Sequence, residues 1–115
     1  VVMSKLIRDK MADVIKVKGI IAHVTELTEE EYASALFDKL IDEAKEVAAC
    51  NDIQDLILEL ADVLEVIEAI ANLNDISDED ILKAKSYKKS IYGGYEKRFL
   101  LTDYRALYKE KIDLE

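Results

Sequence analysis

Residues 28–73 read TEEEYASALFDKLIDEAKEVAACNDIQDLILELADVLEVIEAIANL, and the helical signals in this stretch decide the fold. Thr28 followed three residues later by Glu31 forms a capping box, in which each side chain binds the backbone N–H group of the other residue. This pattern predicts a helix that starts at Thr28 and runs to about Cys50.

A second helix is predicted directly after the first. Asn51 with Gln54 repeats the capping signal, and the helical pattern continues to about Leu73. Two helices joined by so short a connection pack antiparallel. The C-terminal half of the first helix is therefore expected beside the N-terminal half of the second.

The segment before this pair carries a shorter helical pattern. Asp9 is expected to cap a helix that runs to about Lys18, where Gly19 stops it. Residues 20–27 are rich in β-branched types and predict an extended link or a short strand.

The segment after the pair predicts a fourth helix. Ser77 opens it, and it runs to about Tyr92, where Gly93 and the next glycine stop it. The chain has no proline and only 3 glycines, as expected of a helical protein. We expect a single all-α domain over residues 1–115, in which an antiparallel helix pair is flanked by two further helices.

The composition excludes several classes of function. A formal charge of −9 argues against binding to a nucleic-acid duplex, which requires basic groups to neutralise phosphates. The apolar stretches are too often interrupted by charges for a membrane span, and no signal peptide is recognisable. The single cysteine, Cys50, cannot form an internal disulfide, and we expect a reduced thiol in the cytoplasm.

Four acidic residues stand where helix periodicity predicts burial. Glu59 and Asp62 lie on a stripe of the helix over residues 51–73 that continues as Val66. Glu43 falls in the middle of the apolar stripe of the preceding helix, and Glu46 lies one turn on, at its edge. Antiparallel packing would bring the two acidic pairs face to face.

Partly buried carboxylates destabilise a fold by several kcal/mol per ion unless something compensates them. Lys39 is the nearest basic residue, but one lysine cannot pair with four acids. Hard carboxylate oxygens suit Mg²⁺ or Mn²⁺, so these residues predict a metal site. A single Glu-x-x-Glu pair can also be interpreted as a set of ordinary surface charges. The matching acidic pair on the second helix argues against that interpretation.

The acidic segments read DEAKE at residues 42–46 and ELAD at residues 59–62. They resemble the E-E-x-x-E and E-x-x-D signature of the all-α nucleotide pyrophosphohydrolases, the MazG-like and phosphoribosyl-ATP pyrophosphohydrolase superfamily. Asp42 replaces the first glutamate of that signature, which keeps the charge and shortens the reach of the side chain.

Two segments that flank the acidic motifs narrow the resemblance to one subgroup of this superfamily. KLIRDK at residues 5–10 and GGYEKR at residues 93–98 are similar to the KLVRDK start and GGFEKR ending of small phosphoribosyl-ATP pyrophosphohydrolase-like proteins. Two departures are Met11, where that subgroup usually has proline, and Tyr92, where a basic residue is common. The second departure leaves the substrate preference open.

The resemblance implies Mg²⁺-dependent hydrolysis of a nucleoside triphosphate, or of phosphoribosyl-ATP, between the α and β phosphates. It assigns the metal and the catalysis to the four acids Glu43, Glu46, Glu59 and Asp62. Basic residues are expected to complete the phosphate site, with Arg8 and Lys88 preferred among five candidates: Lys5, Arg8, Lys88, Lys97 and Arg98.

The helix over residues 51–73 is apolar around more than half of its circumference, which four helices of one chain would struggle to cover. A homodimer or a dimer of dimers, forming a helical-bundle oligomer, is therefore expected, in agreement with the resemblance. The alternative to an enzyme is a catalytically silent helical interaction or regulatory module that has kept the fold.

Overall fold

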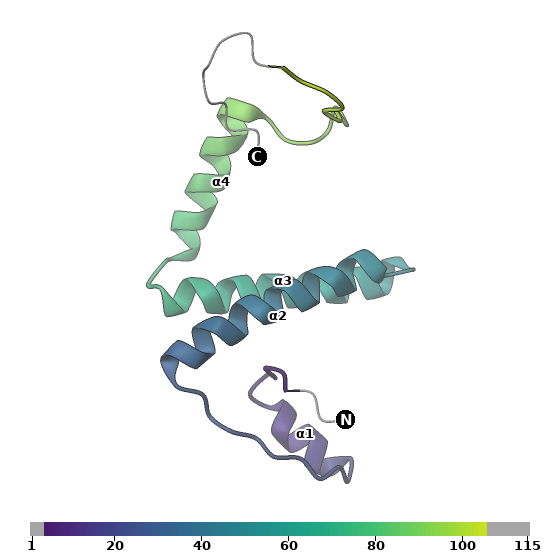
Figure 1. The fold of residues 1–115 in the computed structure, drawn as a ribbon, viewed down its shortest axis with the longest axis vertical. Helices are drawn as coiled ribbons and strands as arrows, with labels where there is room; N and C mark the ends of the chain where they lie inside the picture. The colour runs from purple at the N-terminus through teal and green to yellow at the C-terminus, as the bar shows by residue number, and fades with distance from the viewer. Residues whose placement is uncertain (1–3, 106–115) are drawn as a thin grey trace. The chain divides into compact units, whose positions relative to one another are not determined.

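The computed structural model describes residues 4–105, and in this part of the chain it contains four α-helices and no β-strand (Figure 1). The prediction of an all-α fold is confirmed. The helices are α1 (Met11–Val17), α2 (Glu29–Ala49), α3 (Ile53–Leu73) and α4 (Asp78–Tyr92). None of them combines the length and the apolar character that a membrane crossing requires.

The chain divides into two compact units, with the boundary directly after Ile81. The first unit holds α1, α2 and α3, and most of α4 belongs to the second. The prediction of one domain over residues 1–115 stays a prediction.

The start of α2 is held by the expected capping box. The backbone N–H of Glu31 donates to Thr28 Oγ1 over 3.2 Å, and the backbone N–H of Thr28 donates to Glu31 Oε1 over 3.0 Å. The bond from the Thr28 backbone favours the charged carboxylate and lowers the pKa of Glu31. Cys50 is the C-terminal cap, so the predicted bounds of this helix are confirmed.

The start of α3 differs by one residue from the prediction. Asp52, and not Asn51, is the N-cap, and its Oδ1 accepts the backbone N–H of Asp55 over 2.9 Å. Asn and Asp cap helices about equally well, so two adjacent capping residues leave the start undecided until the backbone is known. Asp52 has the extended backbone of an N-cap, which settles it. The predicted end at Leu73 is confirmed.

The first helix is shorter than predicted and begins without a side-chain cap. Lys10 occupies the N-cap position, so Asp9 does not cap the helix as expected. The turn directly before the helix is closed by the backbone N–H of Met11, which donates to the carbonyl oxygen of Arg8 over 2.9 Å. Gly19 has a φ of 74°, which an L side chain rarely adopts, and the predicted stop is confirmed.

Residues 20–27 form the extended link of the prediction and not the short strand. The structure contains no other strand among residues 4–105 with which they could pair, and backbone groups without a partner strand stay outside a sheet.

The bounds predicted for α4 are confirmed at both ends. Ser77 Oγ accepts the backbone N–H of Asp80, and Asp80 Oδ2 accepts the backbone N–H of Ser77. Gly93 has a φ of 82° and donates its N–H to the carbonyl oxygen of Lys89 over 2.9 Å. Residues 95–105 contain no helix, and the rest of the predicted C-terminal tail lies outside the described residues.

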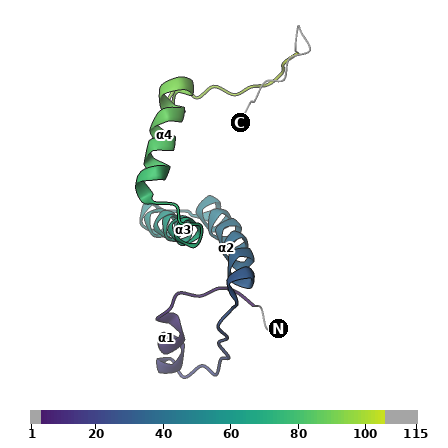
Figure 2. The same ribbon diagram turned by 90° about the vertical axis from the view of Figure 1, so that its left-hand side faces the viewer.

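The helices α2 and α3 lie side by side and antiparallel (Figure 1 and Figure 2). They are the helices of the described part that pack extensively on each other, and three buried apolar side chains lie on them: Leu36, Val66 and Ala71. The predicted antiparallel pair is therefore present, whereas the flanking role of α1 and α4 stays a prediction.

Candidate metal centre

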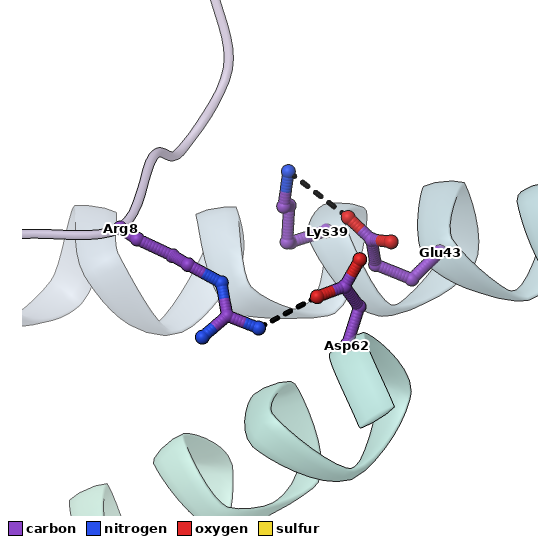
Figure 3. Close-up of polar contacts among 4 residues, drawn as sticks. All are labelled: Arg8, Lys39, Glu43 and Asp62. Carbon is purple, nitrogen blue, oxygen red and sulfur yellow. Dashed lines mark hydrogen bonds and ion pairs between the residues drawn. The ribbon is translucent and has the colours of Figure 1, made fainter. Parts of the chain in front are cut away.

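The most unusual side chain of the α2 and α3 pair is Glu43. It lies on the same stripe of α2 as the buried Leu36, as the periodicity predicts, and its side chain is only 7% exposed. Lys39, one turn earlier on α2, places its Nζ 3.1 Å from Glu43 Oε1 (Figure 3). The other oxygen, Oε2, is buried and has no hydrogen-bond partner.

Two further glutamates complete a cluster with Glu43. One carboxylate oxygen from each of Glu43, Glu46 and Glu59 lies within 4.8 Å of the other two. Glu46 comes from α2 and is exposed, while Glu59 comes from α3 and is half-buried. Glu59 Oε2 is a second buried oxygen without a hydrogen-bond partner. Helix periodicity and antiparallel packing thus bring together three of the four predicted acids.

The cluster changes the acidity of Glu59. A proton shared in a hydrogen bond with the Glu46 carboxyl group, followed by desolvation and by the negative charges of Glu46, Asp62 and Glu43, raises the pKa of Glu59 to about 7. Like charges at close range disfavour a second ionised carboxylate. Without a cation, the cluster therefore holds a proton under conditions in which a solvated glutamate does not.

These features fit a hard divalent cation. A buried carboxylate oxygen without a partner is normally avoided, because its lost hydration is not replaced. Glu43 and Glu59 each present such an oxygen, and the three residues offer oxygen ligands only. Oxygen-only ligand sets suit Mg²⁺ or Mn²⁺. The cluster can therefore hold a metal through Glu43, Glu46 and Glu59.

Asp62 has a different partner from the one expected. It lies on α3 about one turn after Glu59, but it is not part of the group of oxygens within 4.8 Å. Its Oδ1 accepts a hydrogen bond of 2.6 Å from Arg8 Nη2, and this ion pair is visible beside the Lys39 and Glu43 pair in Figure 3. The Asp62 carboxylate raises the pKa of Arg8 further, so the guanidinium stays charged.

The other four predicted phosphate-binding residues lie outside α2 and α3. Lys5 is exposed in the segment before α1. Lys88 lies on α4, and Lys97 and Arg98 follow that helix, so these three belong to the second unit. The Lys97 ammonium lies 5.9 Å from the centre of the Phe99 ring. Their role at a phosphate stays a prediction.

Sequence reasoning found the acids and missed the Arg8 and Asp62 pair. Arg8 was expected to bind a phosphate, yet it binds one of the acids. The two residues are separated by 54 positions, and helix periodicity relates only residues within one helix. The available signal was the KLIRDK block at residues 5–10, which placed Arg8 among the candidates without assigning its partner.

No protein-family model matches the chain, and neither a curated protein nor a solved structure matches it significantly. The similarity of residues 42–46 and 59–62 to the pyrophosphohydrolase signature therefore stays a resemblance. What the chain itself provides is a cluster of three glutamates from two antiparallel helices, with two buried oxygens that lack a partner.

Proposed function

We propose that this protein is a Mg²⁺-dependent nucleotide pyrophosphohydrolase that converts a nucleoside triphosphate, or a related nucleotide such as phosphoribosyl-ATP, into the monophosphate and pyrophosphate. The observation that carries the proposal is the pair of buried, unpartnered oxygens of Glu43 and Glu59 within the three-glutamate cluster. The resemblance of the acidic segments and their flanks supplies the substrate class.

The residues divide the work as follows. Glu43, Glu46 and Glu59 hold the cation, and Asp62, about one turn after Glu59 on α3, is proposed as a fourth ligand. When bound, Mg²⁺ neutralises phosphate charge and orients the attacking water. The water oxygen bonds to one phosphorus of the α,β linkage, the bond from that phosphorus to the bridging oxygen breaks, and a carboxylate of the cluster accepts the water proton.

The direct test is pyrophosphate release from a panel of nucleoside triphosphates and from phosphoribosyl-ATP, with Mg²⁺ or Mn²⁺ present and with chelator. We expect metal-dependent turnover of at least one member. The panel also separates a general nucleotide hydrolase from one that acts on phosphoribosyl-ATP, which the carboxylates alone cannot do because both reactions use the same metal chemistry.

A catalytically silent helical module is the second candidate. It is favoured by the two ion pairs, because Lys39 and Arg8 already compensate part of the charge of Glu43 and Asp62. A silent module shows no metal-dependent turnover with any nucleotide, and neutralising its acids is harmless or stabilises the fold. An enzyme instead loses both metal binding and activity.

Assembly into a homodimer or a dimer of dimers is part of the proposal. A stripe of apolar side chains at helical spacing along α3 is exposed, and the Leu64 residue in it is 66% exposed. The stripe consists of Ile53, Ile57, Leu60 and Leu64. A contiguous exposed apolar stripe on a helix is typical of an interface between subunits.

The free thiol of Cys50 fits a reducing compartment, and we propose a cytoplasmic location.

A further inference from the structure

The ion pair between Arg8 and Asp62 joins one of the predicted phosphate-binding residues to one of the predicted metal ligands. Arg8 Nη2 lies 2.6 Å from Asp62 Oδ1, with side chains that are 58% and 36% exposed. Arg8 belongs to the segment before α1, and its carbonyl oxygen is fixed by the N–H of Met11. This local turn holds the Arg8 backbone next to the start of α1, and the guanidinium reaches Asp62 on α3.

The formal charges of the site explain why an arginine is found there. When all four are ionised, the acids Glu43, Glu46, Glu59 and Asp62 bring four negative charges, and Lys39 and Arg8 bring two positive ones. A divalent cation added to this set would supply the remaining two. With the cation bound, most of the charge of the acids is neutralised without the guanidinium. A nucleotide brings new negative charge, with which the guanidinium can pair.

We propose that Arg8 is an exchangeable counter-ion of the metal site. It pairs with Asp62 while the glutamate cluster holds no cation, gives Asp62 up when a divalent cation binds, and then pairs with a phosphate of the nucleotide. This inference rests on the proposed function and adds a regulation to it: metal binding releases the side chain that receives the substrate.

The two ion pairs differ in the free energy needed to separate them, and exchange requires a pair that separates at small cost. An exposed pair contributes little to stability, because water competes with it on both sides. Arg8 and Asp62 form such a pair and can separate at small cost. Lys39 and Glu43 lie on one helix at i, i+4 spacing, and the Glu43 side chain is buried, so loss of Lys39 would leave an uncompensated buried charge. Exchange is therefore assigned to Arg8 and not to Lys39.

The opposite role for Arg8 is to hold Asp62 in place as a positioning residue for the metal. The two roles predict opposite signs for the same measurement. If Arg8 competes with the cation for Asp62, its removal strengthens metal binding. If Arg8 positions Asp62 for the cation, its removal weakens metal binding.

The test uses Mn²⁺ as the probe, titrated by calorimetry into the full-length protein without nucleotide. We expect Arg8→Gln to bind Mn²⁺ more tightly than the wild type by up to about fivefold, the most that an exposed ion pair usually contributes. Lys16→Gln, which removes the same charge from an exposed position on α1, is the matched control and should leave the affinity nearly unchanged. Circular dichroism confirms that both variants are folded.

A double-mutant cycle shows whether the effect passes through Asp62. In an Asp62→Asn background, Arg8→Gln should no longer tighten Mn²⁺ binding, because the competing contact is already lost. In the Mn²⁺-loaded protein, Arg8→Gln should weaken binding of an α,β-methylene nucleoside triphosphate. Tighter binding of the metal together with weaker binding of the nucleotide is a combination that a purely structural role does not produce.

The outcomes separate the two proposals. Mn²⁺ binding that is equal or weaker in Arg8→Gln overturns the exchange while leaving the metal site intact. An unchanged tightening in the Asp62→Asn background also overturns it, because the effect then comes from general charge. Absence of Mn²⁺ binding in the wild type and in Arg8→Gln removes the metal centre, and with it the proposed function and the exchange.

Discussion

Glu43 on α2 and Glu59 on α3 each carry a buried carboxylate oxygen without a hydrogen-bond partner, and both residues belong to one cluster with Glu46. Each helix alone would place one acid on its packing surface. Their antiparallel packing turns two unfavourable positions into one site with a defined requirement for positive charge, and this requirement leads to testable predictions.

Divalent metal should stabilise the protein. A ligand that binds only the folded state raises the melting temperature by mass action, and the increase grows with ligand concentration. We expect Mg²⁺ or Mn²⁺ to raise the melting temperature in differential scanning fluorimetry, and chelator to reverse the rise. Glu43→Gln should abolish the metal-dependent rise, whereas Glu68→Gln, on the exposed side of α3, should retain it. Identical melting curves with and without metal would remove the preformed site.

Activity should depend on the carboxylates of the glutamate cluster and not on the overall charge of α3. Glu59→Gln changes almost no shape and should reduce pyrophosphate release by at least about 10- to 100-fold, the usual cost of losing even a group that only supports a metal ligand. Glu68→Gln is again the matched control on the same helix. Glu65 is less suitable, because its charge acts on Arg8. Equal activity of Glu59→Gln and Glu68→Gln in an active enzyme would exclude Glu59 from the site.

Stability without metal should fall as the pH rises towards and beyond neutrality. The pKa of Glu59 is raised from 4.5 to about 7 in the folded protein, so between these values the folded state binds more protons than the unfolded state. The contribution of Glu59 is fully present below pH 4.5 and is lost as the pH rises through about 7.

The control for this pH dependence is Glu59→Gln, whose neutral amide imitates the protonated acid. The difference in unfolding free energy between the two proteins, measured in urea with chelator, should grow from pH 5 to pH 8 in favour of the variant. Glu31, whose pKa is lowered, acts in the opposite direction at acidic pH and is common to both proteins, so it cancels. A difference that does not change with pH would contradict the shifted pKa of Glu59.

Assembly should depend on the exposed apolar stripe of α3. Leu64→Glu places a charge in the proposed interface and should shift sedimentation from oligomer to monomer, since an unpaired charge is not buried without large cost. Val17→Glu, at an exposed apolar position on α1, is the control and should leave the oligomer intact. A wild-type protein that sediments as a folded monomer at all concentrations would refute the interface.

The start of α3 provides a test of the fold itself. Asp52→Ala removes the N-cap contact to Asp55 and should lower the free energy of unfolding by about 1 kcal/mol. Asn51→Ala, at the position expected from the sequence, should have a much smaller effect. Equal destabilisation by both substitutions, measured by urea denaturation, would show that Asp52 is not the cap.

The parts of the fold that depend on neighbouring residues were predictable. The capping box at Thr28 and the glycine stops at Gly19 and Gly93 need only a few adjacent residues, and all three are confirmed. The start of α3 was wrong by one residue, because Asn51 and Asp52 are both good caps and only the backbone chooses between them.

For the candidate site, helix periodicity limits which contacts can be predicted from the sequence. The burial of Glu43 and the approach of Glu59 follow from helical spacing and from one short connection, and both could be predicted. The partner of Asp62 could not, because the position of Arg8 depends on the path of an irregular segment that has no sequence period. The sequence indicated which residues matter there, and the structure shows which of them touch.

The connection between α2 and α3, residues 50–52, is short. The site therefore combines contacts between residues that are close in the sequence with one contact between distant residues. Glu43, Glu46 and Glu59 approach one another as soon as these two helices form a hairpin, so their cluster has a low contact order and a small entropy of loop closure. The Arg8 and Asp62 pair closes a loop over 54 positions. The negative cluster is therefore expected to assemble early in folding, and its arginine counter-ion to arrive afterwards.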